Sequence, residues 1–443
     1  MRKKTTIDTP ASDAEKRGAE NGIYRDLRWD KLDNTAHLFP VIAGEQMSNV
    51  YRISVTLTEL IVPELLQKAL DIVLPKFDGF NVRLRCGIFW YYFEENGKRA
   101  PVVEEESAYP CQFIRANRNS SYLFRISYYK YRINLEVFHV LTDGMGAVNF
   151  LRELTYQYLR LLHPELKAND SFDSDTSLCR EDSFLKNYRR SSGKHYRTQR
   201  ALHIKGERFH NGELGVIHGY MKSAELKQVS RNYGASINEY LVSAYIWSIY
   251  TEYLNRQPVS TPIRVAVPVN LRPYFDSITT KNFFVMVSAE FLPDWEDYTF
   301  QELLDSVKEH LRGQMNREHL ERVFSYSVSY QRNPLMRLMP LPVKKLAMRT
   351  VYARSARANT ATISNMGIIE VSDTYRPYIE QFHVLIALSK GQHVRGTVCS
   401  YDDTLVFSFS HDLVDVSVQR GFFRRLTADG IQVEIESNGV NYG

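Results

Sequence analysis

The chain has 443 residues, a formal net charge of +5 at pH 7, and an ordinary globular balance of 44% hydrophobic and 24% charged residues. This length is enough for two domains of ordinary size, and the charge is too mild to indicate nucleic-acid binding. No stretch approaches the run of about 18 apolar residues that indicates a transmembrane helix, and the first residues do not resemble a secretory signal.

The cysteines and the first residues bear on compartment and order. Cys86, Cys111, Cys179 and Cys399 lie far apart, without the close spacing of a metal site. We therefore expect free thiols in a reducing compartment, the cytoplasm, and no bound metal. Residues 1–22 are polar and charged with few apolar side chains, which predicts a disordered leader.

The first half of the chain, residues 23–165, combines strand and helix patterns. Residues 50–57 are rich in β-branched side chains and predict a strand, and Pro63 opens a helix with apolar residues on one face. The strand expected after this helix carries Arg83 and Arg85.

The most informative stretch spans residues 131–154. Apolar residues alternate from 133 to 137, which predicts a strand, and they recur at helical spacing from 147 onward. His139 therefore lies where a strand ends, Asp143 and Gly144 form a turn, and a helix follows. A strand end is a rigid position for a side chain. Histidine titrates near neutrality, which suits a general base.

Residues 166–212 lack sustained periodicity and predict a crossover linker between two halves. Such a segment is either a solvated surface or, because it is basic, a site for coenzyme phosphates. Its basic residues are Lys186, Arg189, Arg190, Lys194, Arg197, Arg200, Lys205 and Arg208.

The second half, residues 213–443, begins again with a strand and then helices. Ser236 with Glu239 three residues later matches a capping box at a helix start. Further strands are expected at 263–270, 283–291 and 361–364, with helices at 300–311, in parts of 335–351 around Pro340 and Pro342, and at 416–426.

An internal echo links the two halves. Residues 394–411 predict a strand, a tight turn and a second strand, followed by His411, Asp415 four residues later, and a helix. The order of events from 123 to 143 is the same, with His139 and Asp143 in the matching places. The sequence therefore predicts two copies of one α/β unit.

The arrangement His139-x-x-x-Asp143-Gly144 on a strand, turn and helix resembles the signature of the coenzyme A-dependent acyltransferase superfamily. That group includes chloramphenicol acetyltransferase, peptide-synthetase condensation domains and alcohol acetyltransferases. Phe138 replaces the first of the two histidines that many members carry. Residues 364–367 (Ser-Asn-Met-Gly) and 268–272 resemble further segments of the alcohol acetyltransferase-like and condensation-domain-like branch. The plant motif Asp-Phe-Gly-Trp-Gly is absent; residues 281–285 loosely take its place.

The resemblance covers about residues 30–430 and implies a fold and a site. The fold is α/β with mixed sheets, built from two similar chloramphenicol acetyltransferase-like subdomains in a pseudo-twofold arrangement. A channel between the subdomains holds His139 at its middle. Asp143 is expected to point away from His139 and pair with an arginine, for which we expect Arg83 or Arg85.

Three further residues follow from the same resemblance. Gly144 permits the corner and a close approach of backbone to substrate. Ser364 or Asn365 faces the channel and could donate to an oxyanion; the alternative is a plain turn.

The activity implied is transfer of an acyl group from a coenzyme A or acyl-phosphopantetheine thioester to an alcohol or amine, with no permanently bound cofactor. An acyl carrier protein is a further potential partner. No Gly-x-Ser-x-Gly segment is present, which favours direct transfer with His139 as base. Two alternatives stay open: a non-catalytic protein of this fold that binds a carrier protein or small ligand, and a base at His411. The second is weaker, since Val416 rather than glycine follows Asp415.

Overall fold

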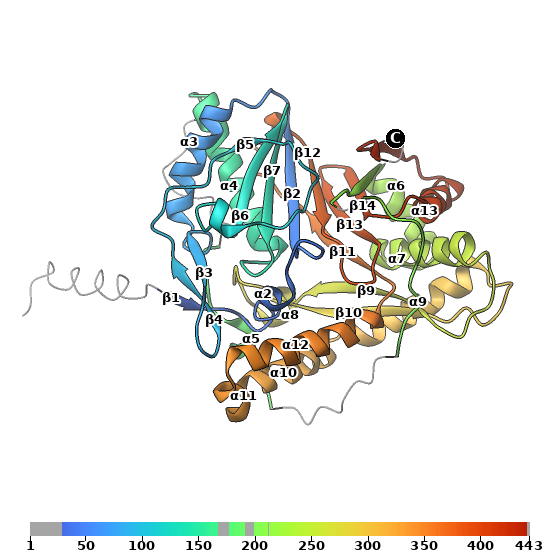
Figure 1. The fold of residues 1–443 in the computed structure, drawn as a ribbon. Coiled ribbons are helices and arrows are strands. Elements are labelled where there is room, and N and C mark those ends of the chain that lie inside the picture. Colours follow the sequence, from blue (N-terminus) through green and yellow to red (C-terminus); the bar gives the residue numbers. More distant parts are fainter. Residues whose placement is uncertain (1–28, 167–176, 191–198, 211, 441–443) are drawn as a thin grey trace, which may run out of the picture.

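The computed structural model describes residues 29–166, 177–190, 199–210 and 212–440. The expected disordered leader at 1–22 lies outside the described residues, as do parts of the expected linker. Two main mixed sheets lie side by side, each with its own hydrophobic core (Figure 1).

The first sheet has five strands in the order β12-β2-β7-β6-β5. Helices α3 and α4 contact each other, and their buried side chains belong to the same hydrophobic core as the sheet. Its elements are β2 (Val50–Leu57), α3 (Pro63–Val73), β5 (Glu104–Glu105), β6 (Phe124–Tyr129), β7 (Arg132–Phe138), α4 (Gly144–Leu162) and β12 (Ile379–Ile386).

The second sheet has seven strands in the order β10-β9-β11-β13-β14-β8-β15. Helices α7, α9 and α13 pack together in its core. Its elements are β8 (Gly215–Lys222), α6 (Ser223–Asn232), α7 (Ile237–Ser248), β9 (Ile263–Asn270), α8 (Arg272–Phe275), β10 (Phe284–Phe291), α9 (Phe300–Gln314), β11 (Ala361–Ile368), β13 (Val394–Tyr401), β14 (Thr404–His411), α13 (Ser417–Ala428) and β15 (Glu434–Ser437).

The remaining elements lie along the lower side of the molecule in Figure 1. A small antiparallel sheet has the order β1-β4-β3, and α12 contacts α2. These elements are β1 (Trp29–Lys31), α2 (Phe39–Ile42), β3 (Val82–Cys86), β4 (Tyr91–Glu95), α5 (Ser183–Lys186), α10 (Arg317–Arg332), α11 (Pro334–Leu338) and α12 (Leu341–Ser355).

The predicted internal repeat is confirmed by strand pairing. In the first sheet β2 pairs with β7, the second strand of the β6–β7 hairpin; in the second sheet β8 pairs with β14, the second strand of the β13–β14 hairpin. All four pairings are antiparallel. Each entry strand is followed by a helix, α3 or α6, and each hairpin by another, α4 or α13.

The two halves are joined by exchange of a strand as well as by contact. Strand β12 comes from the second half of the sequence but pairs with β2 over Tyr51–Leu57. The subdomain limits 23–165 and 213–443 stay a prediction. The first sheet includes β12, which lies outside residues 23–165.

Local signals explain several boundaries. The capping box at Ser236 and Glu239 is formed at the start of α7. A second one, at Thr299 and Glu302, starts α9. Pro340 ends the α11 region and caps α12, because proline tolerates a first helical turn but not a helix interior.

Candidate active site

His139 follows directly on the last residue of β7, and its backbone N–H donates to the Asn49 carbonyl at 2.9 Å. Its ring stacks on Phe39 with centroids 4.6 Å apart and meets the edge of Tyr51 at 4.9 Å. Phe284 of β10 lies 5.6 Å away on the other side. His139 therefore lies between the two halves, held by aromatic rings from both. Its side chain is half-buried rather than closed off, so solvent-sized space reaches it.

A hydrogen-bonded chain fixes the tautomer of His139. Its Nδ1 lies 3.0 Å from the Asn282 Oδ1, and the Asn282 Nδ2 donates to the Asp33 Oδ2 at 2.9 Å. Because Asp33 accepts from the amide nitrogen, the amide oxygen faces the imidazole, so Nδ1 carries the proton. The Nε2 atom then keeps its lone pair, as a general base requires.

Burial sets the charges in this chain. It lowers the pKa of His139 below its ordinary value, so the ring is neutral near pH 7. Burial also raises the pKa of Asp33 to about 7, although the Asn282 amide and the Ala36 N–H both donate to this carboxylate.

Asp143 caps α4 and points away from His139. Its carboxylate accepts hydrogen bonds from Nη1 and Nη2 of Arg272, at 2.9 and 3.0 Å, and from the backbone N–H of Phe283 at 3.0 Å. Tyr51 donates its hydroxyl to the carbonyl of Asp143 at 2.9 Å. The motif corner is thus fastened to the β9–β10 region of the other half.

The expected partners of Asp143 were wrong. Arg83 and Arg85 both bind Glu94, across the β3–β4 hairpin. Neighbours on paired strands satisfy these two arginines, whereas Asp143 faces the turn that begins α8. The orienting arginine is Arg272.

Gly144 lies against the Met366 side chain of the segment 364–367. A Cβ on Gly144 would lie 2.4 Å from the Met366 side chain, so the glycine admits a close packing of β11 on the motif corner. Ser364 is two residues before Met366 on β11, ahead of an irregularity in the pairing with β13 between Asn365 and Ile368. It is half-buried, with no protein hydrogen bond to its hydroxyl among the described residues. Asn365 is engaged: its Oδ1 accepts the Gly367 N–H at 2.8 Å.

His411, the alternative base, is fully buried at the end of β14. Its Nδ1 lies 2.9 Å from the Leu413 carbonyl, and its Nε2 is buried without a partner in the part of the chain described here. A Cβ on Gly215 would lie 2.4 Å from that Nε2. Asp415 caps the backbone N–H of Ser417 at the start of α13. The ring is packed against backbone and has no room for a substrate.

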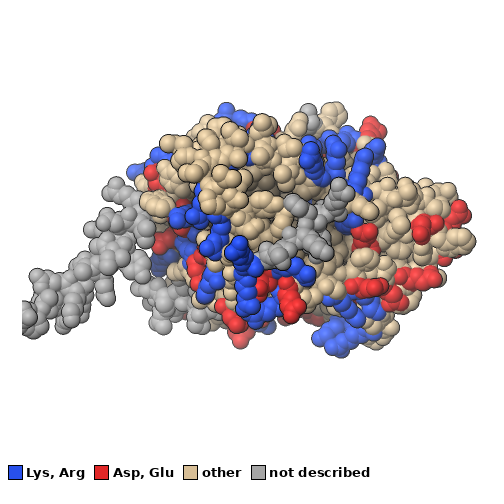
Figure 2. Space-filling view, turned by 90° about the horizontal axis from the view of Figure 1, so that it is seen from below, with Lys and Arg blue, Asp and Glu red and all other residues tan. Residues whose placement is uncertain are grey.

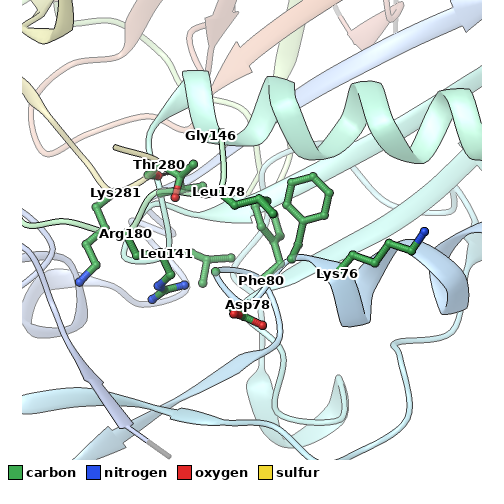
Figure 3. A pocket seen from close by; sticks show the side chains of 12 residues that line it. Lys76, Asp78, Phe80, Leu141, Gly146, Leu178, Arg180, Thr280 and Lys281 are labelled. Carbon is green, nitrogen blue, oxygen red and sulfur yellow. Dashed lines mark hydrogen bonds between the residues drawn. The ribbon is translucent and has the colours of Figure 1, made fainter. Parts of the chain in front are cut away.

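One small cavity borders the motif corner, and a larger cavity is lined by residues outside the site. The small cavity, of about 40 Å³, lies behind the motif corner and is lined by residues that include Phe80, Leu141 and Gly146 (Figure 3). It is too small for a substrate. A second cavity, of about 620 Å³, is lined by aromatic and basic side chains, among them His37, which stands between Asp33 and Phe39 in the sequence.

The sequence did not identify Asp33, Phe39 or Asn282 as part of the site. Asn282 falls in residues 281–285, which were noted only for lacking a plant motif. Nothing in the local sequence around Asp33 separates it from an ordinary turn residue. Asp33 accepts the backbone N–H of Ala36 three residues later. This arrangement is common in turns and does not by itself indicate a site.

The described ranges contain no cluster of His, Cys, Asp or Glu that could hold a metal, and no helix long and apolar enough to cross a membrane. Of the basic residues at 186–208, Lys186, Arg189 and Arg208 form ion pairs with acids of the chain. Lys194 and Arg197 lie outside the described residues.

The similarity of this chain to known proteins lies in its structure. No family model and no curated protein matches the sequence. Polyketide synthase associated protein 5 from Mycobacterium tuberculosis is similar with a TM-score of 0.57 and 14% identity, over 90% of this chain and 97% of that one.

Two further structures are similar at low identity. The trichothecene 15-O-acetyltransferase from Fusarium sporotrichioides has a TM-score of 0.57 and 10% identity, over 91% of this chain and 95% of that one. A mutant starter condensation domain of rhizomide synthetase, in complex with C8-CoA, has a TM-score of 0.59 and 12% identity, over 94% and 100%. The chain therefore has the two-subdomain α/β fold of the coenzyme A-dependent acyltransferases and condensation domains.

Proposed function

We propose that this protein is an acyltransferase that moves an acyl group from a coenzyme A or carrier-protein thioester to an alcohol or amine, with His139 as the general base. The observation that carries the proposal is the Asp33–Asn282–His139 chain at the junction of the two halves. It leaves Nε2 unprotonated in a half-buried ring.

The reaction needs no covalent enzyme intermediate. The acceptor hydroxyl or amine gives its proton to His139 Nε2 while it attacks the thioester carbonyl. The tetrahedral intermediate carries its negative charge on the former carbonyl oxygen. When it collapses, the carbon–sulfur bond breaks, and the thiolate takes the proton back from Nε2. The ring returns to its starting state.

Ser364 is the oxyanion donor in this proposal. Its hydroxyl has no protein partner among the described residues, and it lies two residues from Met366, whose side chain packs on the motif corner. Asn365 is the weaker choice, because its amide oxygen is used by the turn. A fixed donor at a developing oxyanion is commonly worth about 10²–10³-fold in turnover.

The donor and the compartment follow from the same proposal. The condensation domain of similar fold was solved with C8-CoA, which supports an acyl-CoA donor; a phosphopantetheine on a carrier protein presents the same thioester. The described cysteines are all free, which supports a reducing compartment, the cytoplasm. A non-catalytic binding role is disfavoured, since a protein without chemistry has no need of the His139 tautomer.

The test is to incubate the purified protein with acetyl-, octanoyl- and palmitoyl-CoA, each with a panel of alcohols and amines, and to follow free thiol release. The proposal predicts acceptor-dependent release and an ester or amide product by mass spectrometry. Release no faster than hydrolysis with every pair, including thioesters on a carrier protein, would contradict it.

A further inference from the structure

Arg395 is a half-buried cation without an acidic partner. It lies in β13, inside the protein, and its Nη1 donates to the Ala387 carbonyl. Its Nε is buried with no hydrogen-bond partner, and no carboxylate pairs with it in the described part of the chain. The groups that act on it electrostatically are two phenols and a thiol, of Tyr352, Tyr245 and Cys111.

Other buried arginines of the molecule are arranged differently. Arg52 binds Glu136, Arg264 binds Glu290, and Arg272 binds Asp143. An uncompensated buried charge costs several kcal/mol, and burial lowers the pKa of Arg395 to about 10. A residue kept at such a cost is typical of a site that receives an anion from outside the chain.

The position of Arg395 relates it to His139. The Ala387 residue that accepts from Arg395 donates its own N–H to the Val50 carbonyl at 3.0 Å. The preceding Asn49 accepts the His139 N–H. The positive charge of Arg395 also lowers the pKa of His139. Both side chains are half-buried, and hydrogen bonds link both residues to the chain at the start of β2.

We propose that Arg395 binds a carboxylate of the substrate beside the reacting group. This inference rests on the proposed acyl transfer and narrows its substrates to carboxylate-bearing ones. The planar guanidinium offers two parallel N–H donors to a carboxylate. The carboxylate belongs either to the acceptor, as in a hydroxy acid or amino acid, or to the acyl chain, as in a dicarboxylic thioester.

Binding is tested without turnover. Calorimetric titration of the protein with benzoate, and with benzamide as the uncharged match, gives the affinity for the charge itself. We expect benzoate to bind and benzamide not to, and Arg395→Gln to weaken benzoate binding at least tenfold. Arg354→Gln, which removes an exposed positive charge from α12, is the control and leaves binding unchanged. No benzoate binding by the native protein, or equal binding by Arg395→Gln, would overturn the proposal.

The thermal stability of a second variant distinguishes a ligand-binding role of Arg395 from a purely structural one. Arg395→Met replaces the buried charge by an apolar side chain of similar length. Since the charge has no partner, we expect the Tm to stay or rise. A fall of several degrees would assign Arg395 to the fold instead of to a ligand.

Turnover identifies the source of the carboxylate. Acetyl-CoA with hydroxy acids, against the matching methyl esters, tests the acceptor; succinyl-CoA with neutral alcohols, against butyryl-CoA, tests the donor. Arg395→Gln should raise the KM for the charged member of one pair at least tenfold and leave the neutral member unchanged. Transfer that prefers neutral substrates in both pairs contradicts this inference but not the proposed function. Absence of any transfer contradicts the proposed function, while the benzoate titration still decides whether Arg395 binds a carboxylate.

A separate observation concerns the surface of α11 and α12. The apolar side chains Leu335, Leu338, Leu346 and Val351 are exposed by 77%, 72%, 70% and 65%. Val343, Leu346, Ala347 and Val351 recur at helical spacing and are all exposed, so they form one outward stripe. Ile88, exposed by 75%, lies beside this stripe, because its carbonyl accepts the Leu341 N–H. We call this set the α11–α12 stripe.

The stretch of chain that carries the α11–α12 stripe has basic but no acidic side chains. Residues 322–369 contain no Asp or Glu, and in the view from below Lys and Arg groups lie beside broad tan surface (Figure 2). The basic side chains of this stretch on and after α11 form no salt bridge in the described part of the chain. Lys344 is buried and donates to the Phe89 carbonyl; the others are at least partly exposed, and they are Arg337, Lys345, Arg349, Arg354 and Arg357.

We infer that the α11–α12 stripe rests on a lipid bilayer with anionic headgroups. An outward row of Leu and Val with basic residues around it matches an interfacial helix, which inserts its apolar side chains and pairs its cations with headgroups. The row is a helix ridge and not a groove, which favours a deformable lipid surface over a folded partner.

Vesicle flotation tests this inference. We expect the protein to float with phosphatidylcholine vesicles that contain 30% phosphatidylserine, less with pure phosphatidylcholine, and less at high salt. Leu338→Ser with Leu346→Ser should abolish flotation, while Leu60→Ser, an exposed leucine elsewhere, should not. No flotation with the anionic vesicles, or capture by an acidic carrier protein that these two substitutions abolish instead, would overturn it.

Discussion

A histidine acts as a base only when the reacting nitrogen is free of a proton, and here two residues from distant parts of the sequence ensure this. His139 and Asp143 could be predicted from their spacing on a strand and a turn. Asn282 and Asp33 could not, because only the folded chain makes their hydrogen bonds: Asn282 contacts the imidazole across 143 residues of sequence, and Asp33 contacts Asn282 across 249. In the proposed function their role is to position His139.

The Asn282 side chain is expected to affect turnover more than binding. Asn282→Leu keeps the volume but removes the acceptor for His139 Nδ1–H, so the tautomer with a free Nε2 is no longer enforced. We expect kcat to fall by about 10–100-fold, less than the roughly 10²–10⁴-fold that general-base catalysis as a whole supplies, because the imidazole itself stays in place, while KM changes by less than about threefold. Asn282→Gln should recover part of kcat. A raised KM with an unchanged kcat would assign Asn282 to substrate binding.

Asp33 is expected to make stability depend on pH. Burial raises the pKa of Asp33 to about 7 in the folded protein, from an ordinary value near 3.8. Between these values the folded state holds a proton that the unfolded state has lost, so stability declines as pH rises through this window. Relative to Asp33→Asn, the native protein should lose about 3 kcal/mol between pH 5 and pH 8. Denaturant melts of both proteins at the two pH values measure this, and parallel curves would contradict it.

At the scale of elements, the motif corner is held by a contact between halves. The turn before α4 could be predicted from Asp143 and Gly144. The arginine that pairs with Asp143 could not, because the sequence does not show which arginine lies near it in the fold. In the structure Arg83 and Arg85 bind Glu94 on the neighbouring strand. Arg272, the first residue of α8, binds Asp143 instead.

The Arg272–Asp143 pair is nearly buried, with side-chain exposures of 10% and 9%. Arg272→Ala leaves a buried carboxylate uncompensated and should cost about 3–5 kcal/mol, seen as a lower Tm. Arg83→Ala is the matched control, since it removes an arginine from a more exposed pair, with side-chain exposures of 30% and 29%, and should change the Tm much less. Equal effects of the two substitutions would contradict the assignment of Arg272.

Gly146 is expected to be a packing position in the first turn of α4. A Cβ there would lie 2.1 Å from the Thr142 Oγ1 and 2.7 Å from the backbone oxygen of Thr280. Gly146→Ala should therefore destabilise the protein by about 1–3 kcal/mol. Gly313→Ala, in the last turn of α9 with nothing within 4 Å of the new Cβ, should be neutral or stabilising by about 0.5–1 kcal/mol. Thermal melts of the pair check this, and a tolerated Gly146→Ala would show that the corner can shift.

At the scale of the whole molecule, the account depends on two copies of one unit that diverged in use. The repeat was visible in the sequence, since both hairpins end in His-x-x-x-Asp before a helix, and strand pairing confirms it. The contribution of β12 to the first sheet was not visible, because the residues of the strand do not show which sheet it joins; only its pairing with β2 does. One histidine of the repeat lies at the junction with space beside it; the other is packed against Gly215.

The central claim is that the first of these histidines, and not the second, does the chemistry. The most direct measurement is acceptor-dependent thiol release by His139→Ala and His411→Ala, each checked for folding by circular dichroism and thermal melting. We predict that His139→Ala keeps the Tm within a few degrees and loses about 10²–10⁴-fold in kcat/KM, while His411→Ala lowers the Tm and retains most of its turnover per folded molecule. Turnover by folded His139→Ala within tenfold of the native protein would contradict the account.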